Sequence, residues 1–494
     1  MNRGTLNSHP RKNSVSEPNQ QKKRLQRIRI IGILVAVLLS IPVLILEFTW
    51  DENHLQRILS AGKLRVITFN GPTTYYEDNQ GKGGFEYELA RAFANNLGVE
   101  LEIRLADQFD KIMPELKAAH VDMAAAGLTI TEDRKKQFSF SAPYQTIKQQ
   151  VIFRGGGKKR PHSAANLVGR NIMITSGSSH VERLEKLKEK YPELSWQETA
   201  DETPENLLIR VWEKKLDLTV ADSNIVAVVR QYYPDLNIAF SLPPDDKLAW
   251  MFTFSSDHSL IDAANDFLKE MKSSGKLDRL LDRYYGPSSK FNYVNTKKFL
   301  ERIGNLLPEY EDMFRRAGEE AGIDWRLLAA QAYQESHWNA DAVSPTGVRG
   351  IMMLTNATAK RLKISDRRNP EESIEGGSRY LKLLIDSLPT RIPHPDRLWF
   401  ALAAYNIGIG HLEDARILTQ KAGDDPDSWL DVRKYLPLLA RPEWHKKTRY
   451  GYARGYEPVA YVNRIRSFYA ILSWSDAQRK RPVDILNNID LPAL

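Results

Sequence analysis

The chain has 494 residues, 42% of them hydrophobic, with 28 Gly and 25 Pro. This length exceeds what one hydrophobic core usually organises, so we expect two or three domains. The 70 Lys and Arg against 62 Asp and Glu give a net charge of +8, which suits either an acidic partner or solubility alone. Because there is no cysteine, disulfides, a thiol nucleophile and a cysteine-based metal site are excluded.

The N-terminal segment is first basic and then apolar. Residues 1–29 are polar and rich in Lys and Arg, which predicts a disordered basic segment. The apolar run at 30–46 is near the lower length limit of a membrane-spanning helix, and the cations before it favour a cytoplasmic N-terminus. The run is interpreted as a signal peptide or a membrane anchor: no small-residue cleavage site stands out, but the run is short and contains Pro42. In both cases we expect the rest of the chain to be exported.

Residues 55–287 alternate short β patterns with helical patterns. Apolar residues at helical spacing predict helices over 85–97, 109–119 and 277–285. This alternation is typical of an α/β fold with mainly parallel sheets. The expected strands, each bounded by Gly, Pro, Asp or Ser, are 64–69, 101–104, 121–125, 150–153, 171–175, 218–221 and 250–254.

The character of the chain changes after a predicted linker at 288–299. From residue 300 to 494 helical patterns dominate and strong β patterns disappear, which predicts an all-α second domain. The expected helices are 308–321, 325–338, 356–362, 374–387, 397–406, 429–439 and 458–473.

Glu335 is the first candidate for chemistry in the second domain. Asp324 can cap a helix that begins at Trp325, and Leu328, Ala332 and Glu335 then share one face of that helix. A carboxyl group in apolar surroundings has a raised pKa, which makes it a plausible proton donor near neutral pH. A lone Glu-Ser pair is more often a helix-end glutamate in a salt bridge, so the residues around it must decide.

The surrounding residues form an ordered set. Gln334-Glu335-Ser336-His337-Trp338-Asn339 is followed by Ser344, Gly347 and Gly350-Ile351-Met352-Met353, then by Ala404-Tyr405-Asn406, Glu457 and Tyr461-Val462. In this order the set resembles the soluble lytic transglycosylase catalytic domain, a lysozyme-like all-α fold, over roughly residues 300–475. Each piece is weak alone, and the specificity lies in the combination.

The resemblance implies a role for each matching residue. Glu335 matches the catalytic glutamate of that family. Met353 departs from the pattern, because most of the family carries glutamine there and a thioether replaces a hydrogen-bonding amide. For Tyr405, ordinary core packing remains an open alternative. The residues implied to contact the substrate are Ser336, Ser344, Met352, Tyr405, Asn406, Glu457 and Tyr461.

A single glutamate favours one type of reaction. Most glycosidases use two carboxylates, but the sequence has no second carboxylate motif near Glu335, and Asp341 is the nearest candidate. In a lytic transglycosylase, Glu335 would protonate the glycosidic oxygen of a MurNAc-GlcNAc bond and then deprotonate the MurNAc 6-hydroxyl, leaving 1,6-anhydro-MurNAc ends. A lysozyme-type hydrolase and a glycan sensor that does not cut remain alternatives. No His-Glu-x-x-His motif occurs, so we expect neither metal nor cofactor.

The first domain carries a second resemblance. Gly84-Phe85-Glu86, the block from Gly127 to Arg134, and Phe140-Ser141-Ala142-Pro143-Tyr144 resemble the family 3 solute-binding proteins, which bind amino acids between two lobes. A solvated charge is the alternative reading of Arg134. The resemblance implies that Arg134 binds a ligand carboxylate, that Asp222 binds an ammonium, and that Thr129, Ser178 and Ser179 assist.

The joined architecture resembles a membrane-bound family of lytic murein transglycosylases. It implies a periplasmic protein that is peripheral on the inner face of the outer membrane, with anchoring in the inner membrane by 30–46 as the alternative. The implied partners are peptidoglycan strands and an amino acid or muropeptide that regulates access to Glu335. Because the basic cluster precedes the apolar run, membrane topology explains it better than nucleic acid does, and no nucleic-acid partner is expected.

Overall fold

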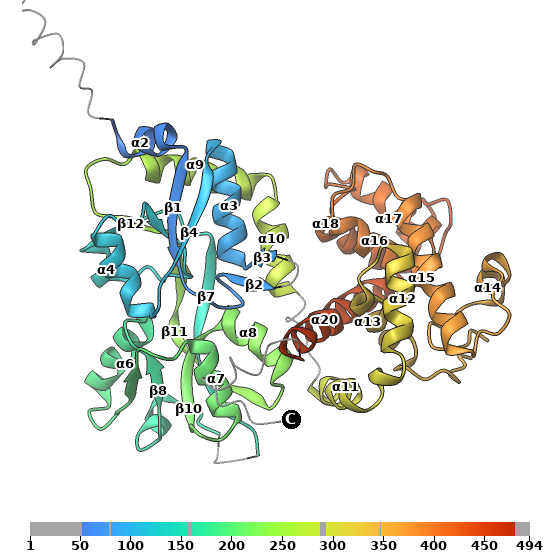
Figure 1. Cartoon of the computed structure of the whole chain (residues 1–494), viewed down its shortest axis with the longest axis horizontal. Coiled ribbons are helices and arrows are strands. Elements are labelled where there is room, and N and C mark those ends of the chain that lie inside the picture. Colours follow the sequence, from blue (N-terminus) through green and yellow to red (C-terminus); the bar gives the residue numbers. More distant parts are fainter. Residues whose placement is uncertain (1–51, 79–80, 157–159, 287–292, 346, 480–494) are drawn as a thin grey trace, which may run out of the picture. The chain divides into compact units, whose positions relative to one another are not determined.

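The computed structural model describes residues 52–78, 81–156, 160–286, 293–345 and 347–479 (Figure 1). The chain divides into two units, Met1–Ala61 and Gly62–Leu494, which are described separately. In the first unit, helix α2 spans His54–Ala61. The segments expected at 1–29 and 30–46 lie outside the described residues. Of the helices with described positions, none combines the length and the apolar character needed to cross a membrane.

The first domain contains a five-stranded sheet in the order β4-β1-β5-β12-β6. Strand β1 is parallel to β4 and β5, whereas β12 is antiparallel to β5 and β6. The strands are β1 Lys63–Thr68, β4 Glu100–Leu105, β5 Met123–Ala124, β6 Phe138–Phe140 and β12 Met251–Thr253.

A second sheet has the order β10-β7-β11, and both of its strand pairs are antiparallel. The expectation of mainly parallel sheets is therefore wrong for this part of the domain. Its strands are β7 Gln145–Arg154, β10 Leu218–Asp222 and β11 Leu236–Leu248, and the short pairs are β2 Tyr76–Asp78 with β3 Gly81–Gly83 and β8 Met173–Thr175 with β9 Gln197–Thr199.

The order of these strands along the chain produces two lobes. Strands of the first sheet lie before and after the segment 145–248, which supplies the second sheet. The first lobe therefore comprises 62–144 and 249–286, and the second lobe is inserted as 145–248. Each lobe has its own buried cluster, with Ile67 and Met251 in the first and Val151 and Val220 in the second. The two-lobed α/β fold expected from the sequence is confirmed.

Helices pack around both sheets (Figure 1). Helix α3 has the predicted bounds and ends at Gly98, whose φ of 72° lies in the left-handed region that glycine adopts readily. The helices of this domain are α3 Phe85–Leu97, α4 Ile112–Lys117, α5 Glu132–Lys135, α6 Ser179–Lys190, α7 Pro204–Trp212, α8 Ser223–Tyr232, α9 Ser259–Ser273 and α10 Lys276–Tyr285, with 3-10 turns at Phe109–Lys111 and Ala164–Leu167.

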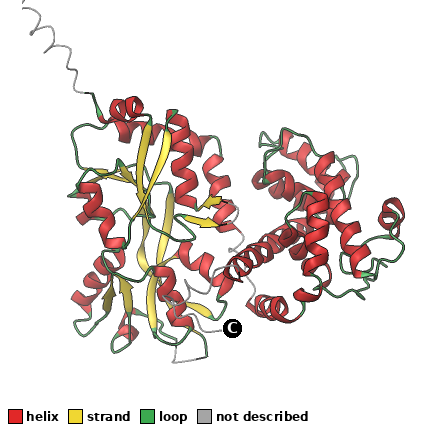
Figure 2. Ribbon diagram, viewed as in Figure 1, coloured by secondary structure: helices red, strands yellow, loops and turns green. Residues whose placement is uncertain are grey.

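The described part of the second domain is helical (Figure 2). Helix α11 begins at Tyr293, inside the linker expected at 288–299, and Phe299 on this helix is buried against Tyr333 and Phe468. The helices are α11 Tyr293–Asn305, α12 Glu311–Ala321, α13 Trp325–Ser336, α14 Asn356–Leu362, α15 Pro370–Ser387, α16 Asp396–Ile407, α17 Ile409–Lys421, α18 Trp429–Tyr435, α19 Pro442–His445 and α20 Tyr456–Arg479, with 3-10 turns at Leu307–Glu309 and Leu436–Ala440.

Candidate active site

Helix α13 positions Glu335 in its last turn. The Asp324 carboxylate caps the helix by accepting the backbone N–H of Arg326 at 2.9 Å. Leu328 and Ala332, which share a face with Glu335, are fully buried, whereas Glu335 itself is half-buried. The apolar face therefore packs the helix into the core and leaves the carboxyl at its end within reach of the surface.

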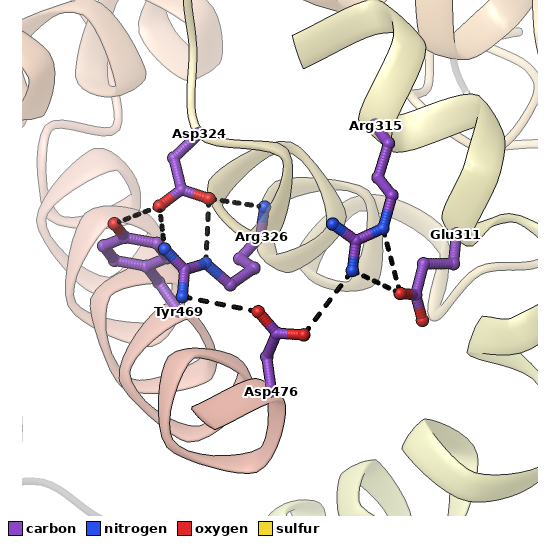
Figure 3. A network of polar contacts seen from close by, with 6 residues as sticks. All are labelled: Glu311, Arg315, Asp324, Arg326, Tyr469 and Asp476. Carbon is purple, nitrogen blue, oxygen red and sulfur yellow. Dashed lines mark hydrogen bonds and ion pairs between the residues drawn. The ribbon is translucent and has the colours of Figure 1, made fainter. Parts of the chain in front are cut away.

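A polar network joins α13 to α12 and α20. Asp324 also pairs with the Arg326 guanidinium at 2.7 Å and accepts a hydrogen bond from Tyr469 of α20 at 2.7 Å. Because these side chains connect three helices, they fix α13 relative to α20, the helix that supplies Tyr461. Figure 3 shows the six members of the network: Glu311, Arg315, Asp324, Arg326, Tyr469 and Asp476.

The chain turns sharply directly after Glu335 and Ser336. His337 and Trp338 have φ angles of 55° and 60°, a left-handed conformation that costs a side-chain-bearing residue roughly 1–2 kcal/mol. Trp338 offsets this cost, since its ring is buried and its Nε1–H donates to the Ala329 carbonyl at 2.8 Å. The turn therefore ends α13 one residue after Glu335, whose side chain lies between the core and the surface.

Glu335 has one described hydrogen-bond donor, the Tyr461 hydroxyl, at 2.5 Å from Oε1. Tyr461 accepts in turn from Nε2 of Gln331 at 3.3 Å, one helical turn before Glu335. Burial raises the pKa of Glu335 to about 7, and the Tyr461 hydrogen bond opposes this rise. Among the described residues, no second carboxylate contributes to the shift. A group with this pKa can donate and accept a proton near neutral pH.

Tyr405 lies close to Glu335, near the end of α16. Its hydroxyl donates to the Met352 carbonyl at 2.9 Å, and its ring packs against Tyr380 at a centroid distance of 5.1 Å. Burial, and then the nearby charge of Glu335, raise the pKa of Tyr405 well above its usual range. Tyr405 is therefore a neutral phenol close to Glu335, and its partly exposed ring also packs against the hydrophobic core.

Two residues expected to contact substrate have their side chains engaged within the protein. The Ser336 hydroxyl donates to the carbonyls of Ile351 at 2.8 Å and Ala332 at 3.2 Å, which ties α13 to the 350–354 turn. The Met352 side chain is fully buried, and a Cβ at Gly377 of α15 would come within 2.7 Å of it. These positions make Ser336 and Met352 supports of the site. Met353, with a φ of 50°, is the partly exposed residue of this turn.

The remaining three residues expected to contact substrate lie at or near the surface. Ser344 is in a turn, where its hydroxyl accepts the N–H of Val348 at 3.2 Å. Asn406 is exposed at the end of α16. Glu457, in the first turn of α20, pairs with Arg454 at 3.1 Å and lies one turn before Tyr461 on the same helix face.

A separate cavity lies between the two lobes of the first domain, and all five residues expected to bind a ligand line it. Its volume is about 30 Å³, which is room for about two water molecules. The first lobe supplies Thr129 and Arg134, and the second supplies Ser178, Ser179 and Asp222. Side chains that are far apart in sequence therefore meet at one cavity.

Hydrogen bonds cross between the lobes at this cavity. The buried guanidinium of Arg134 donates to the Thr129 carbonyl at 2.9 Å in its own lobe and to the Gly177 carbonyl at 2.8 Å in the other. The Ser179 hydroxyl donates to the Thr129 hydroxyl at 3.1 Å. Arg134 is thus a buried group with a hydrogen bond to each lobe, and the interpretation of it as a solvated charge is wrong.

Sequence reasoning missed several residues of both sites. Gln331 orients Tyr461, and its i, i+4 spacing to Glu335 is the signal that could have found it. His180 contacts Asp222 at 3.0 Å, and Asn224 also lines the cavity between the lobes. Glu86 has its pKa raised to about 7 by burial, although it accepts hydrogen bonds from Tyr144 and Gly127.

Comparison with known proteins identifies the family. A relative from Saccharophagus degradans, named membrane-bound lytic murein transglycosylase F, is 44% identical over 467 residues, which cover 94% of this chain and 92% of the relative. The chain belongs to the family of membrane-bound lytic murein transglycosylase F. Relatives with this name from Pseudomonas fluorescens and Ectopseudomonas mendocina are each 46% identical, covering 85% and 89% of this chain and 87% and 90% of their own lengths.

Each domain also matches a family model. Residues 64–287 match the bacterial extracellular solute-binding proteins of family 3, and residues 312–427 match the transglycosylase SLT domain. An ancestral arginine-binding protein bound to arginine is 27% identical, with a TM-score of 0.42, over 45% of this chain and 98% of that chain. The fold class and the expected enzyme class, a lytic transglycosylase acting on peptidoglycan, are confirmed by the family.

Proposed function

We propose that this enzyme cleaves the MurNAc-GlcNAc β-1,4 bond and leaves 1,6-anhydro-MurNAc ends, with Glu335 as acid and then base. The observation that carries the proposal is the carboxyl of Glu335, whose pKa burial raises to about 7 and whose described hydrogen-bond partner is the Tyr461 hydroxyl and not a second carboxylate. Most glycoside hydrolases need two carboxyl groups, one as the acid and one as the base or nucleophile. When the substrate supplies the nucleophile, one is enough.

The reaction proceeds in two proton transfers. In the first, Glu335 gives its proton to the glycosidic oxygen, the bond to the MurNAc anomeric carbon breaks, and the oxocarbenium-like centre is stabilised by the N-acetyl oxygen. In the second, the Glu335 carboxylate removes the proton of the MurNAc 6-hydroxyl as that oxygen bonds to the anomeric carbon. No water is consumed. Tyr461 supports the carboxylate between the two steps, since its hydroxyl donates to Oε1.

Mass spectrometry of digested sacculi tests this reaction. Wild-type protein is expected to release muropeptides lighter by one water than the corresponding reducing products, and Glu335→Gln is expected to release none. Glu335→Asn serves as a second variant that removes the acid with a shorter side chain. Reducing ends from the wild type would indicate a hydrolase of lysozyme type. No release by the wild type would indicate a protein that holds glycan without cutting it.

We propose further that an amino acid or a muropeptide stem binds between the lobes of the first domain and changes the rate at Glu335. Arg134 would bind the ligand carboxylate, because a guanidinium has five N–H donors and two carbonyls use only part of them. Asp222 would bind the ammonium. A cavity of about 30 Å³ is smaller than an amino acid, so entry requires the lobes to separate.

Calorimetric titration and rate measurements test the regulation together. The probes are L-alanine, L-arginine and the muropeptides released from sacculi, each titrated into wild type and Arg134→Ala. A ligand shifts such an equilibrium only through different affinities for the two states. Binding by the wild type that is lost in Arg134→Ala, with a matching change in the wild-type rate, is expected. Equal rates with and without every bound probe would refute the regulation.

The relatives are named as membrane-bound, and we propose that this protein is periplasmic and peripheral on the inner face of the outer membrane. The alternative is an anchor in the inner membrane formed by residues 30–46, which lie outside the described residues. N-terminal sequencing of the protein recovered from each membrane fraction separates the two. A mature chain that begins near residue 50 supports the first location, and an intact N-terminus in the inner membrane supports the second.

A further inference from the structure

An exposed aromatic loop precedes α20. We use this name for residues 446–456, which follow α19 and include the first residue of α20. Three tyrosines in it are more than half exposed: Tyr450 at 51%, Tyr452 at 59% and Tyr456 at 56%. Large aromatic side chains are normally covered, and several of them close together on a surface mark a binding site more often than chance does.

Hydrogen bonds to the underlying residues Asp414 and Leu439 hold the backbone of the aromatic loop. The buried carboxylate of Asp414, on α17, accepts the N–H of Arg449 at 3.1 Å and that of Tyr450 at 2.9 Å. Further along, the N–H of Ala453 donates to the Leu439 carbonyl at 3.2 Å. These contacts hold the loop in one conformation, so the exposed tyrosines are presented on a fixed support.

Tyr450 is further held by Gly410, in the first turn of α17. A Cβ at position 410 would lie 2.8 Å from the Tyr450 ring, a distance that real Cβ contacts do not show. A side chain at position 410 would therefore displace the Tyr450 ring from this position. The absence of a side chain at Gly410 lets Tyr450 lie against the helix and still remain half exposed.

The aromatic loop leads into α20, which carries Tyr461, and contacts α17, which follows α16 in the chain. One end is Tyr456, five residues before Tyr461 on α20, which is about 7.5 Å along the helix axis. The other contact is with α17, which starts directly after α16, where Tyr405 and Asn406 lie. In the sequence between Tyr405 and Gly410, which contacts the Tyr450 ring, Asn406 and Ile409 are exposed.

The aromatic loop also carries positive charge. The Arg449 guanidinium lies 5.5 Å from the centre of the Tyr450 ring. Over 443–457 there are four cations and two acids, a net charge of +2 when His445 is neutral. Those charged residues are Lys446, Lys447, Arg449 and Arg454 against Glu443 and Glu457.

We propose that the aromatic loop is a binding surface for the peptidoglycan strand beyond the bond that is cut. The tyrosine rings would stack on the apolar faces of the sugar rings, and the cations would pair with carboxylates of the lactyl groups and peptide stems. This inference rests on the proposed function. A fixed support favours such contacts, because little side-chain and loop order has to be gained on binding.

The composition of the aromatic loop favours glycan over a lipid surface. Phenol hydroxyls at the ring ends can hydrogen-bond to sugar hydroxyls, whereas surfaces that insert into lipid present Trp, Phe and Leu beside their cations. Within 446–456 the exposed apolar groups are tyrosines, and the other residues are cations, Gly, Ala and Thr. The aromatic loop also leads directly into α20, the helix that carries Tyr461.

Cosedimentation with sacculi tests the proposal in a Glu335→Gln background, which prevents digestion during the assay. Tyr452→Ala combined with Tyr456→Ala is expected to weaken binding at least about tenfold, roughly one stacked ring at about 1.4 kcal/mol. Tyr452→Phe combined with Tyr456→Phe keeps the rings and is expected to keep most of the affinity. Phe254→Ala, which removes another exposed aromatic ring from the first domain, is the matched control and is expected to change nothing. Circular dichroism checks that each variant is folded.

Parallel assays separate failure of this inference from failure of the proposed function. The wild-type product is measured on the same sacculi by mass spectrometry. If the wild type releases anhydro ends but the double alanine variant binds sacculi as tightly as its parent, the aromatic loop has no part in glycan binding. If the double alanine variant instead loses affinity only for anionic phospholipid vesicles, the surface is a lipid contact and the proposal is overturned.

Discussion

Tyr461 donates a hydrogen bond of 2.5 Å to Oε1 of Glu335, across the contact between α20 and α13. Burial raises the pKa of the carboxyl, and this hydrogen bond, which favours the charged form, lowers it. The resulting value of about 7 is suited to a group that must first give and then take a proton. Gln331 holds the phenol in place by donating to its oxygen.

Tyr461→Phe is expected to raise the pKa of Glu335 above about 7, because the one described donor to the carboxylate is removed. The first step needs protonated Glu335, so activity falls as pH rises through this pKa. In the variant the basic limb of the rate profile should therefore move to higher pH, together with a lower maximal rate. The check is the pH dependence of product release from sacculi. A limb that stays in place or moves to lower pH would contradict the assignment.

The stability of Glu335→Gln relative to wild type is expected to depend on pH. The pKa of Glu335 is raised in the fold, so its contribution is fully present below 4.5 and is lost as pH rises to about 7. Glutamine does not titrate. Between pH 4.5 and about 7, the free energy of unfolding of the variant should therefore rise relative to that of the wild type by up to roughly 3 kcal/mol. Thermal unfolding of both proteins at pH 4, 6 and 8 measures it. A difference that is constant across these pH values would show that Glu335 is not desolvated.

Ser336→Ala is expected to lower stability by roughly 1–3 kcal/mol, because the Ser336 hydroxyl donates to the Ile351 carbonyl from a buried position. Urea unfolding measures this loss. If Ser336 instead contacts substrate directly, as the family resemblance implied, the variant should keep its stability and show a raised KM. Ser387→Ala on α15 is a control, since that hydroxyl donates to a carbonyl of its own helix.

Asp324→Ala is expected to cost about 2 kcal/mol, since it removes the cap of α13 and the partner of both Arg326 and Tyr469. Because the network holds α13 relative to α20, the hydrogen bond from Tyr461 to Glu335 should loosen and the rate should fall below that expected from unfolding alone. Asp312→Ala, at an exposed position of α12, is the control. Unchanged stability of Asp324→Ala would show that the network in Figure 3 does not support the site.

The local determinants of the catalytic helix could be predicted from the sequence. Asp324 at the start, apolar residues on one face and Glu335 at the end all follow from helical periodicity, and the structure has α13 at Trp325–Ser336. The i, i+4 spacing of Gln331 to Glu335 places both on one helix face, but a buried glutamine between Ala330 and Ala332 also fits a core position, so the spacing alone does not reveal its role. Its role depends on Tyr461, which is more than 100 residues away and is brought there by packing.

Strand β11 was missed for a different reason. Its second half contains Pro243, Pro244 and two aspartates, which argue against a strand. The structure accommodates them with a register shift between Leu242 and Asp246, where the prolines need no ladder partner. The antiparallel pairing in the second sheet was not predicted either, because alternation of β and helical patterns does not show in which direction the strands pair. The same alternation does not show that the chain returns to the first sheet through β12.

The meeting of Arg134 and Ser179 across the two lobes came from family resemblance and not from periodicity. Arg134 is flanked by Asp133 and Lys135, and such a charged run normally faces solvent. Its burial depends on the carbonyl of Gly177 in the other lobe, a contact that no local pattern contains. Met352 shows that family resemblance also has a limit. It matches a motif residue that was expected to contact substrate, but its side chain is buried against Gly377.

The most direct test of the catalytic role of Glu335 is the mass of the muropeptides released from purified sacculi by wild type and by Glu335→Gln. Release of products one water lighter than reducing muropeptides by the wild type, and none by a folded Glu335→Gln, is the expected result. Anhydro products released at the wild-type rate by Glu335→Gln would contradict the central role of this carboxyl.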